Sequence, residues 1–175
     1  MDTTPQFWKN VGDHLFAGAE ASPPSFATLV FPLVGDAEII SSYLARTARE
    51  DHTVRWRGVW LTDHGIAYAQ ADYPLQAEDD EDRFSSSWGA SGVIAWLRDY
   101  SDLTGVDVSA ATGGRRVTPE GYVRAVFTDY VFKFRDGTSL NVPLPGANPT
   151  AREREAIDRL ATEIVKRRYA KDAAK

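Results

Sequence analysis

The sequence predicts an α+β protein in which a seven-stranded antiparallel sheet curls into a barrel and a C-terminal amphipathic helix caps it. Three observations predict this class. Short runs that alternate apolar and polar side chains recur over residues 52–144, as in half-buried strands. Turn signals separate them, and Asp136-Gly137 is among the strongest, because glycine tolerates the left-handed backbone of a tight reversal. The end of the chain instead carries apolar residues at helical spacing.

Residues 1–51 are expected to form an N-terminal extension with one or two helices. Over residues 4–17 four apolar positions have helical spacing. Two prolines then break this pattern, since proline fixes φ and lacks a donor, and residues 25–34 are expected to be extended. Residues 35–51 predict a second helix with Asp36 as its N-cap. Its apolar stripe consists of Ile39, Ile40, Tyr43 and Leu44.

A β-hairpin is predicted after residue 52. Trp56 and Trp60 lie on the same side of the first strand and are expected in the core. Residues 66–70 form the returning strand, and Gly65 in the turn between them is expected to have a positive φ. The acidic segment 74–92 lacks both periodicities and is expected to be a long exposed loop.

Five further strands complete the predicted sheet, with a flexible connection over residues 111–121. Pro143 marks the end or the edge of the last strand, because it cannot donate to a ladder. These strands are expected at residues 93–98, 103–110, 122–127, 130–135 and 140–144.

The C-terminal helix is the clearest element of the sequence. Thr150 and Glu153 have the spacing of a capping box. The apolar stripe of the helix consists of Ile157, Leu160, Ala161, Ile164 and Val165. The expected domains are therefore an extension over 1–51, a sheet-and-helix domain over 52–170 and a tail over 171–175.

Composition excludes several classes of protein. The chain has 175 residues, one domain's worth, of which 43% are hydrophobic, and five are tryptophans. It contains no cysteine, which excludes disulfides, thiolate nucleophiles, cysteine-bound zinc and iron–sulfur clusters. It has neither a signal-peptide pattern nor an apolar run long enough to span a membrane, so a cytoplasmic location is expected.

The net charge of −5 disfavours nucleic acid as a partner. The run Glu78–Asp82 supplies five negative charges. This run is either a solvated loop or an electrostatic contact for a basic partner, since it lacks the alternating ligands and central glycine of a calcium loop.

The order of elements, with "WLTDHGIAYA", "YSDLTGVDV" and "VFKFRDGTSLNVPL", resembles the pleckstrin-homology-like superfold, particularly its bacterial and GRAM-like members. The resemblance covers residues 52–170. It implies a scaffold that binds phospholipid headgroups, peptides or proteins. Headgroup-binding members place basic residues around the first hairpin loop. Here that loop carries Asp63, the strand after it has no base, and Arg55 and Arg57 alone fit the pattern.

No residue pattern indicates catalysis, a metal or a cofactor. The histidines His14, His52 and His64 have no metal-binding spacing. The adjacent pairs Asp51-His52 and Asp63-His64 predict turns rather than catalytic pairs. The serine-rich segment 85–92 lacks a nucleophile-elbow motif, and residues 109–116 lack the ending of a phosphate loop. An enzyme is therefore not expected.

The sequence favours a non-enzymatic module that binds a protein or peptide through an exposed sheet edge, with self-association possible. Trp88 lies in a polar loop, where it either packs on the barrel or anchors a partner. The alternative is a module that binds anionic headgroups at a membrane surface. Arg55, Arg57, Arg115 and Arg116 would be its contacts, together with the basic end of the last helix.

Overall fold

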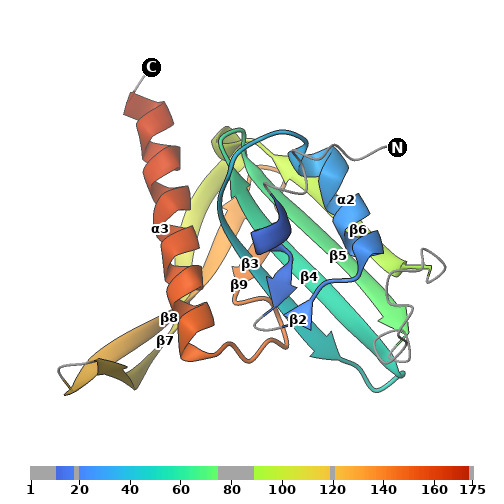
Figure 1. Ribbon diagram of the computed structural model, residues 1–175. Coiled ribbons are helices and arrows are strands. Elements are labelled where there is room, and N and C mark those ends of the chain that lie inside the picture. The colour runs from blue at the N-terminus through green and yellow to red at the C-terminus, as the bar shows by residue number, and fades with distance from the viewer. Residues whose placement is uncertain (1–10, 18–19, 75–88, 119–120, 174–175) are drawn as a thin grey trace. The chain divides into compact units, whose positions relative to one another are not determined.

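The computed structural model describes residues 11–17, 20–74, 89–118 and 121–173 (Figure 1). The chain forms two compact units, Met1–Asp99 and Tyr100–Lys175, and each is described by itself. The protein is α+β, as predicted, and has a C-terminal helix. The predicted single seven-stranded sheet curled into a barrel is wrong, because these strands form a four-stranded sheet and a separate three-stranded sheet.

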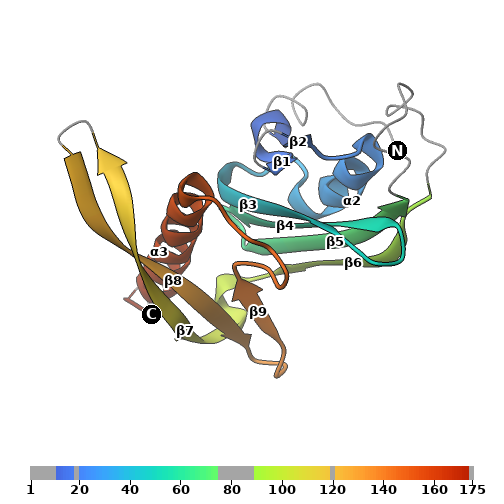
Figure 2. The same cartoon turned by 90° about the horizontal axis from the view of Figure 1, so that it is seen from below.

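The first unit is an antiparallel sheet with one helix on one of its faces (Figure 2). The sheet order is β3-β4-β5-β6, so β3 and β6 are its two edges. A short two-stranded ladder, β1-β2, precedes the helix. The elements are η1 (Gly12–His14), β1 (Phe16–Ala17), β2 (Glu20–Ala21), α2 (Pro24–Val34), β3 (Ile39–Ala48), β4 (Thr53–Thr62), β5 (Ile66–Pro74) and β6 (Ser91–Arg98).

The core of this unit lies between α2 and the sheet. Trp56 and Trp60 are buried there on one face of β4, which confirms the prediction from their alternation. Phe26 of α2 packs against both rings, with centroid separations of 6.4 and 6.0 Å. The neighbouring strand β5 contributes three small side chains, which leave room for these rings against the sheet. They are Ala67, Ala69 and Ala71.

The predicted extended segment over residues 25–34 is wrong, because these residues form most of α2. The proline pair begins this helix instead of preventing it. Pro24 occupies the first turn, where the missing N–H would have had no intrahelical partner. The helix ends at Gly35, whose φ is 54°. Of the helix predicted over residues 4–17, positions 4–10 lie outside the described residues. Val11 is helical, and a 3₁₀ turn over Gly12–His14 leads to β1.

The helix predicted over residues 35–51 is also wrong, because β3 occupies Ile39–Ala48. Tyr43 and Leu44 are neighbours in sequence and both are buried, as in a strand covered on both faces. A doubly covered strand has no clean alternation, and its apolar run has the same spacing as a helical stripe. Since β3 pairs with β4 along its whole length, the expected domain boundary at residues 51 and 52 falls inside a hairpin.

The second unit consists of a long antiparallel pair, a short third strand and a helix. β9 pairs only with Tyr130–Lys133, so β7 and β8 continue past it as a two-stranded ribbon (Figure 2). The elements are η3 (Tyr100–Asp102), β7 (Leu103–Thr118), β8 (Gly121–Phe134), β9 (Ser139–Val142) and α3 (Ala151–Ala173).

This ribbon corrects two predictions. The connection over residues 111–121, which was expected to be flexible, is instead paired strand at all of its described positions. Residues 119–120 lie outside the described residues. The strands expected at 122–127 and 130–135 are one strand, β8, so six strands rather than seven follow residue 52. Glycines and prolines suggested a break, but the ladder from Val108 to Thr118 satisfies the backbone groups of both strands.

Three local predictions for the second unit are confirmed: the turn at Gly137, the capping box at Thr150 and the buried stripe of α3. Gly137 has a φ of 83° in the turn between β8 and β9. The Thr150 hydroxyl accepts a hydrogen bond from the Glu153 N–H, and the Glu153 carboxylate accepts one from the Thr150 N–H. The apolar stripe of α3 is buried at Ile157, Leu160, Ala161 and Ile164. The helix continues to Ala173, past the predicted end of the domain at residue 170.

Candidate binding surface

The edge strand β6 carries the largest cluster of exposed apolar side chains in the described part of the first unit. Val93, Ile94 and Leu97 are 46%, 49% and 46% exposed. No charged residue occurs from Ser91 to Leu97. Among the described residues β6 pairs only with β5, so its other side has no neighbouring strand. Protected edge strands usually carry a charge or a proline in their interior, whereas the charge of this strand, Arg98, is at its last position. We call Val93–Leu97 the β6 edge.

The β6 edge has apolar side chains on both faces of the sheet. Leu97 is opposite Ala67 in the register, and Ala67 belongs to the core under α2, so Val93 and Leu97 lie on the helix-covered face. Ile94 and Trp96 lie on the other face, where Trp96 is opposite Tyr68. A strand added to this edge would therefore meet apolar side chains on both of its faces.

Side chains of β5 hold β6 in position. The rings of Tyr68 and Trp96 stack with centroids 5.2 Å apart and planes at 24°. The Arg98 guanidinium lies 4.7 Å from the centre of the Trp96 ring, in cation–π geometry. The Gln70 amide donates to the Gly92 carbonyl at 3.4 Å, next to a β-bulge where Gly92 has a φ of 58°. These contacts fix the strand before any partner binds, which lowers the entropic cost of binding.

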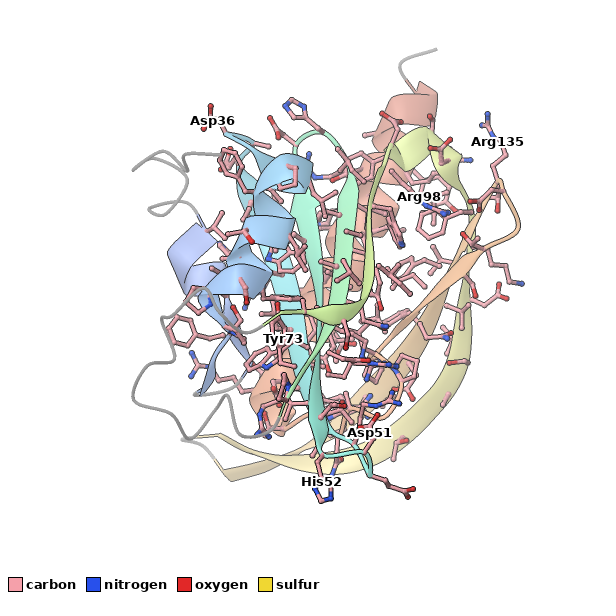
Figure 3. All side chains as sticks on the ribbon, turned by 90° about the vertical axis from the view of Figure 1, so that its right-hand side faces the viewer. Asp36, Asp51, His52, Tyr73, Arg98 and Arg135 are labelled. Carbon is pink, nitrogen blue, oxygen red and sulfur yellow. The ribbon has the colours of Figure 1, made fainter. Side chains whose placement is uncertain are left out.

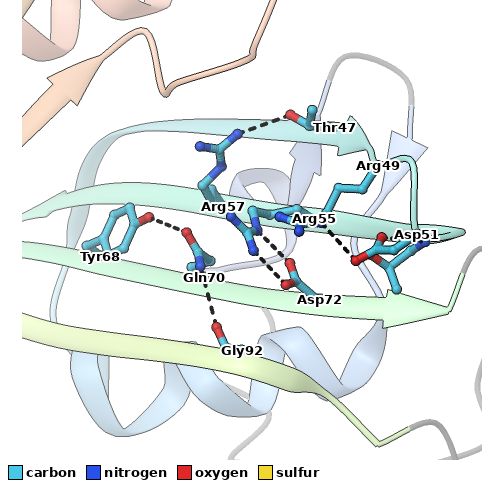
Figure 4. Close-up of polar contacts among 10 residues, drawn as sticks. Thr47, Arg49, Asp51, Arg55, Arg57, Tyr68, Gln70, Asp72 and Gly92 are labelled. Atoms are coloured by element: carbon cyan, nitrogen blue, oxygen red, sulfur yellow. Dashed lines mark hydrogen bonds and ion pairs between the residues drawn. The ribbon is translucent and has the colours of Figure 1, made fainter.

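An ion pair between Arg55 and Asp72 lies on the face of the sheet that carries Tyr68 and Trp96 (Figure 4). Arg55 Nε donates to Asp72 Oδ1 at 2.6 Å, and Nη2 donates to Oδ2 at 2.7 Å. The hydrogen bonds from Arg55 hold the pKa of Asp72 below its ordinary 3.8, although burial opposes this. The same bonds raise the pKa of Arg55. Arg55 is therefore committed to a carboxylate within its own sheet.

Arg57 is likewise part of the internal network rather than an exposed cation. It is only 6% exposed, and its Nη2 donates to Thr47 Oγ1 at 3.1 Å (Figure 4). Burial lowers the pKa of Arg57 because it penalises the charged form. Burial also raises the pKa of the Tyr68 phenol, which donates to Gln70 Oε1 at 3.1 Å. The first unit therefore uses both predicted arginines to organise the face beside the β6 edge.

We expect the replacement Asp72→Asn to lower the free energy of unfolding at pH 7 by about 1–3 kcal/mol, because it leaves a largely buried guanidinium without its carboxylate. A depressed folded pKa contributes stability above the unfolded value, 3.8, and this contribution disappears as the pH falls through the folded pKa. The difference between wild type and variant should therefore shrink below about pH 4. Urea denaturation at several pH values measures it.

Asp51→Asn is the control for this measurement. Asp51 pairs with Arg49 at 3.4 Å on the exposed β3–β4 turn, where ion pairs contribute little. A loss of stability equal to that of Asp72→Asn, or a difference that does not change below pH 4, would contradict the assignment.

The other predicted contact residues belong to the second unit or lie outside the described residues. Trp88 and the acidic run Glu78–Asp82 lie outside the described residues. Arg115 and Arg116 belong to the β7–β8 ribbon of the second unit, where the register pairs Arg115 with Arg124. Within the described part of the first unit, the structure thus brings together Arg55 and Arg57.

The predicted turn roles of the histidines next to aspartates are confirmed. Asp51 and His52 lie at the β3–β4 turn (Figure 3), where His52 has a φ of 57°. His64 is exposed in the β4–β5 turn, with its Nε2 3.8 Å from Asp63 Oδ1. Neither histidine is recessed beside paired carboxylates. Across residues 11–17, 20–74, 89–118 and 121–173 there is no group of three potential metal ligands.

Sequence reasoning predicted a strand at residues 93–98 but not its place in the sheet. The available signal was the uncharged run "SGVIAWL", which is typical of a buried central strand. The exposure of this strand depends on its place in the sheet order, which the run does not encode.

No helix in the described ranges combines the length and the apolar character needed to cross a bilayer. No family model matches the chain, and no curated protein or solved structure matches it either.

Proposed function

We propose that this protein is a non-enzymatic binding module of the pleckstrin-homology-like type, which recognises an extended segment of a protein partner along the β6 edge. One observation carries the proposal. An edge strand with no charged residue from Ser91 to Leu97, and with no neighbour on its outer side among the described residues, exposes apolar side chains on both faces. Such an edge is an aggregation hazard in a protein without a partner, so its presence favours a role in binding.

The order of elements supports the superfold part of the proposal. The seven strands β3 to β9 follow one another in antiparallel meanders, and the amphipathic helix α3 comes after them. This is the order on which the resemblance rests, although the strands start at Ile39 instead of after residue 52. The resemblance implies a binding scaffold, and the surface itself must supply the choice of partner.

Addition of a strand to β6 would combine two kinds of interaction. Backbone N–H and C=O groups on the outer side of the strand would pair with those of the partner. Apolar side chains of the partner would cover Val93 and Leu97 on one face and Ile94 on the other, with a gain of about 25 cal/mol per Å² of apolar area removed from water. The partner segment is therefore extended and apolar, without charges in its centre.

The alternative of headgroup binding has less support at this face. Its cations would be Arg55 and Arg57, but Arg55 is held by Asp72 and Arg57 is buried. Release of Arg55 for a phosphate would leave a largely buried carboxylate without its partner, which is costly. The protein-binding hypothesis requires no such rearrangement.

Phage display of random heptapeptides on the immobilised wild-type protein tests the proposed function. We expect enrichment of apolar, β-prone peptides without central charges. Their affinity should fall at least about tenfold in the double variant Ile94→Lys/Leu97→Lys, because each lysine places a charge against an apolar contact.

A matched control is the double variant Val108→Lys/Val126→Lys in the second unit. These valines are 62% and 66% exposed, so the control adds the same charge to apolar positions that are at least as accessible as Ile94 and Leu97. Enriched peptides that bind both variants equally well, or no enrichment on the wild type, would overturn the proposal.

A further inference from the structure

The β6 edge is symmetric about Ala95 in the apolar character of its residues. Val93 and Leu97 lie two positions on either side of Ala95, and Ile94 and Trp96 lie one position on either side. Two residues directly opposite each other in an antiparallel pair point to the same face. Two copies of β6 that pair antiparallel at Ala95 therefore place Val93 against Leu97 on one face and Ile94 against Trp96 on the other.

Other registers match less well. A shift of the pairing by two residues towards the end of the strand places Arg98 opposite Ile94 and Asp99 opposite Val93. A shift by a single residue would set side chains from opposite faces against each other, because the side-chain period of a strand is two. The register centred on Ala95 gives every apolar residue from Val93 to Leu97 an apolar partner.

Charge complementarity at the ends of the pair favours the same register. It places Arg98 of the partner subunit opposite Gly92, which has no side chain. The Asp72 carboxylate lies over this glycine, since a Cβ built on Gly92 would be 2.8 Å from Asp72 Oδ2. A carboxylate can accept about four hydrogen bonds, so Asp72 can bind a second guanidinium while it keeps Arg55. Each subunit thus offers an acidic group where the other brings an arginine.

We infer that the partner at the β6 edge is a second copy of this chain, paired antiparallel through β6 about a two-fold axis at Ala95. The inference rests on the proposed function and names its partner. The two four-stranded sheets then form one continuous sheet of eight strands, with both α2 helices on the same face. The contact is isologous, so it closes at two subunits and leaves no β6 edge exposed.

Cross-linking through a single introduced cysteine tests this register, because the chain has no cysteine of its own. The full-length variant Ala95→Cys places its two thiols at the two-fold axis, with Cβ atoms about 5 Å apart. Mild oxidation is expected to give mostly disulfide-linked dimer. Ile94→Cys is the matched control on the same exposed strand. Its symmetry mates lie about 7–8 Å apart on the diagonal, so it should cross-link at least about tenfold more slowly.

Sedimentation equilibrium of the cysteine-free chain provides the second readout. We expect a reversible dimer whose dissociation constant rises at least about tenfold in Ile94→Lys/Leu97→Lys but changes little in Val108→Lys/Val126→Lys. A wild type that stays monomeric, or thiols at positions 94 and 95 that cross-link equally fast, would overturn the inference. If the wild type is monomeric while displayed peptides still bind the β6 edge, the second copy is excluded and the proposed function stands. If peptides also fail to bind, both are wrong.

Discussion

The variant Trp60→Ala is expected to lose about 3–5 kcal/mol of unfolding free energy, one of the two largest effects predicted for this chain. The Trp60 ring is completely buried and packs 6.0 Å from the Phe26 ring of α2. It also covers Gly58, and its Nε1 donates to the His14 carbonyl at 3.1 Å. Alanine would leave a cavity between helix and sheet and remove the donor that ties the N-terminal segment to β4.

Tryptophan fluorescence during urea denaturation measures this loss in the unit concerned, because all five tryptophans lie in the first unit. Val126→Ala is the control. Its side chain is 66% exposed in the second unit, and its replacement should change the unfolding free energy by no more than about 0.5 kcal/mol. A loss below 1 kcal/mol for Trp60→Ala would mean that α2 does not pack on this face of the sheet.

Gly65→Ala should also destabilise the first unit strongly, by about 3 kcal/mol or more, because the new methyl group has no space. A Cβ on Gly65 would lie 2.1 Å from the Arg98 carbonyl oxygen and 3.0 Å from its carbon. Both are backbone atoms of β6, so no side-chain rotation relieves the overlap. The strand would have to move away from the β4–β5 turn, which breaks the pairing of Ile66 with Arg98.

The matched control for this variant is Gly12→Ala in the same unit. A Cβ on Gly12 meets no atom within 4 Å, so this replacement should change the unfolding free energy by less than about 1 kcal/mol. Equal losses in the two glycine variants would exclude the close approach of the turn to β6 as the cause.

The role of Gly65 marks the limit of what its sequence context predicts. The segment "TDHG" correctly indicated a turn, and we expected glycine there for a positive φ. The residues with positive φ in the described ranges do not include Gly65. Its lack of a side chain is needed for the contact with the carbonyl of Arg98, thirty-three positions along the chain. Local turn rules contain no information about such a neighbour.

Local signals succeeded where they act over a few residues. The capping box of Thr150 and the reversal at Gly137 are satisfied within three or four positions, so the sequence alone predicts them. The predictions for the N-terminal third were wrong because the spacing of its apolar residues fits both a helix and a strand that is covered on both faces, as in β3. The choice between them depends on pairing with β4, which is a tertiary contact.

The sequence predicted that the candidate surface is an exposed sheet edge, but not which strand forms that edge. An exposed sheet edge was expected, and so was a strand at residues 93–98, but the sequence does not state that this strand is the edge. Arg55 and Arg57 were predicted as contacts for a ligand because they fit the basic pattern around the first hairpin of headgroup-binding pleckstrin-homology-like domains. Arg55 lies directly opposite Asp72 of β5, which binds it. Arg57 donates to Thr47 of β3, which lies diagonally across from it.

The length difference between β9 and the ribbon has an energetic consequence for the second unit. Near Tyr130 a third strand supports the β7–β8 ladder, whereas from Ala110 onward the two strands pair only with each other among the described residues. An isolated two-stranded ladder is only marginally stable in water. The two-stranded part of the ribbon beyond Ala110 can therefore lose its pairing while the stripe of α3 around Leu160 remains packed. Such local opening requires far less free energy than unfolding of the whole unit.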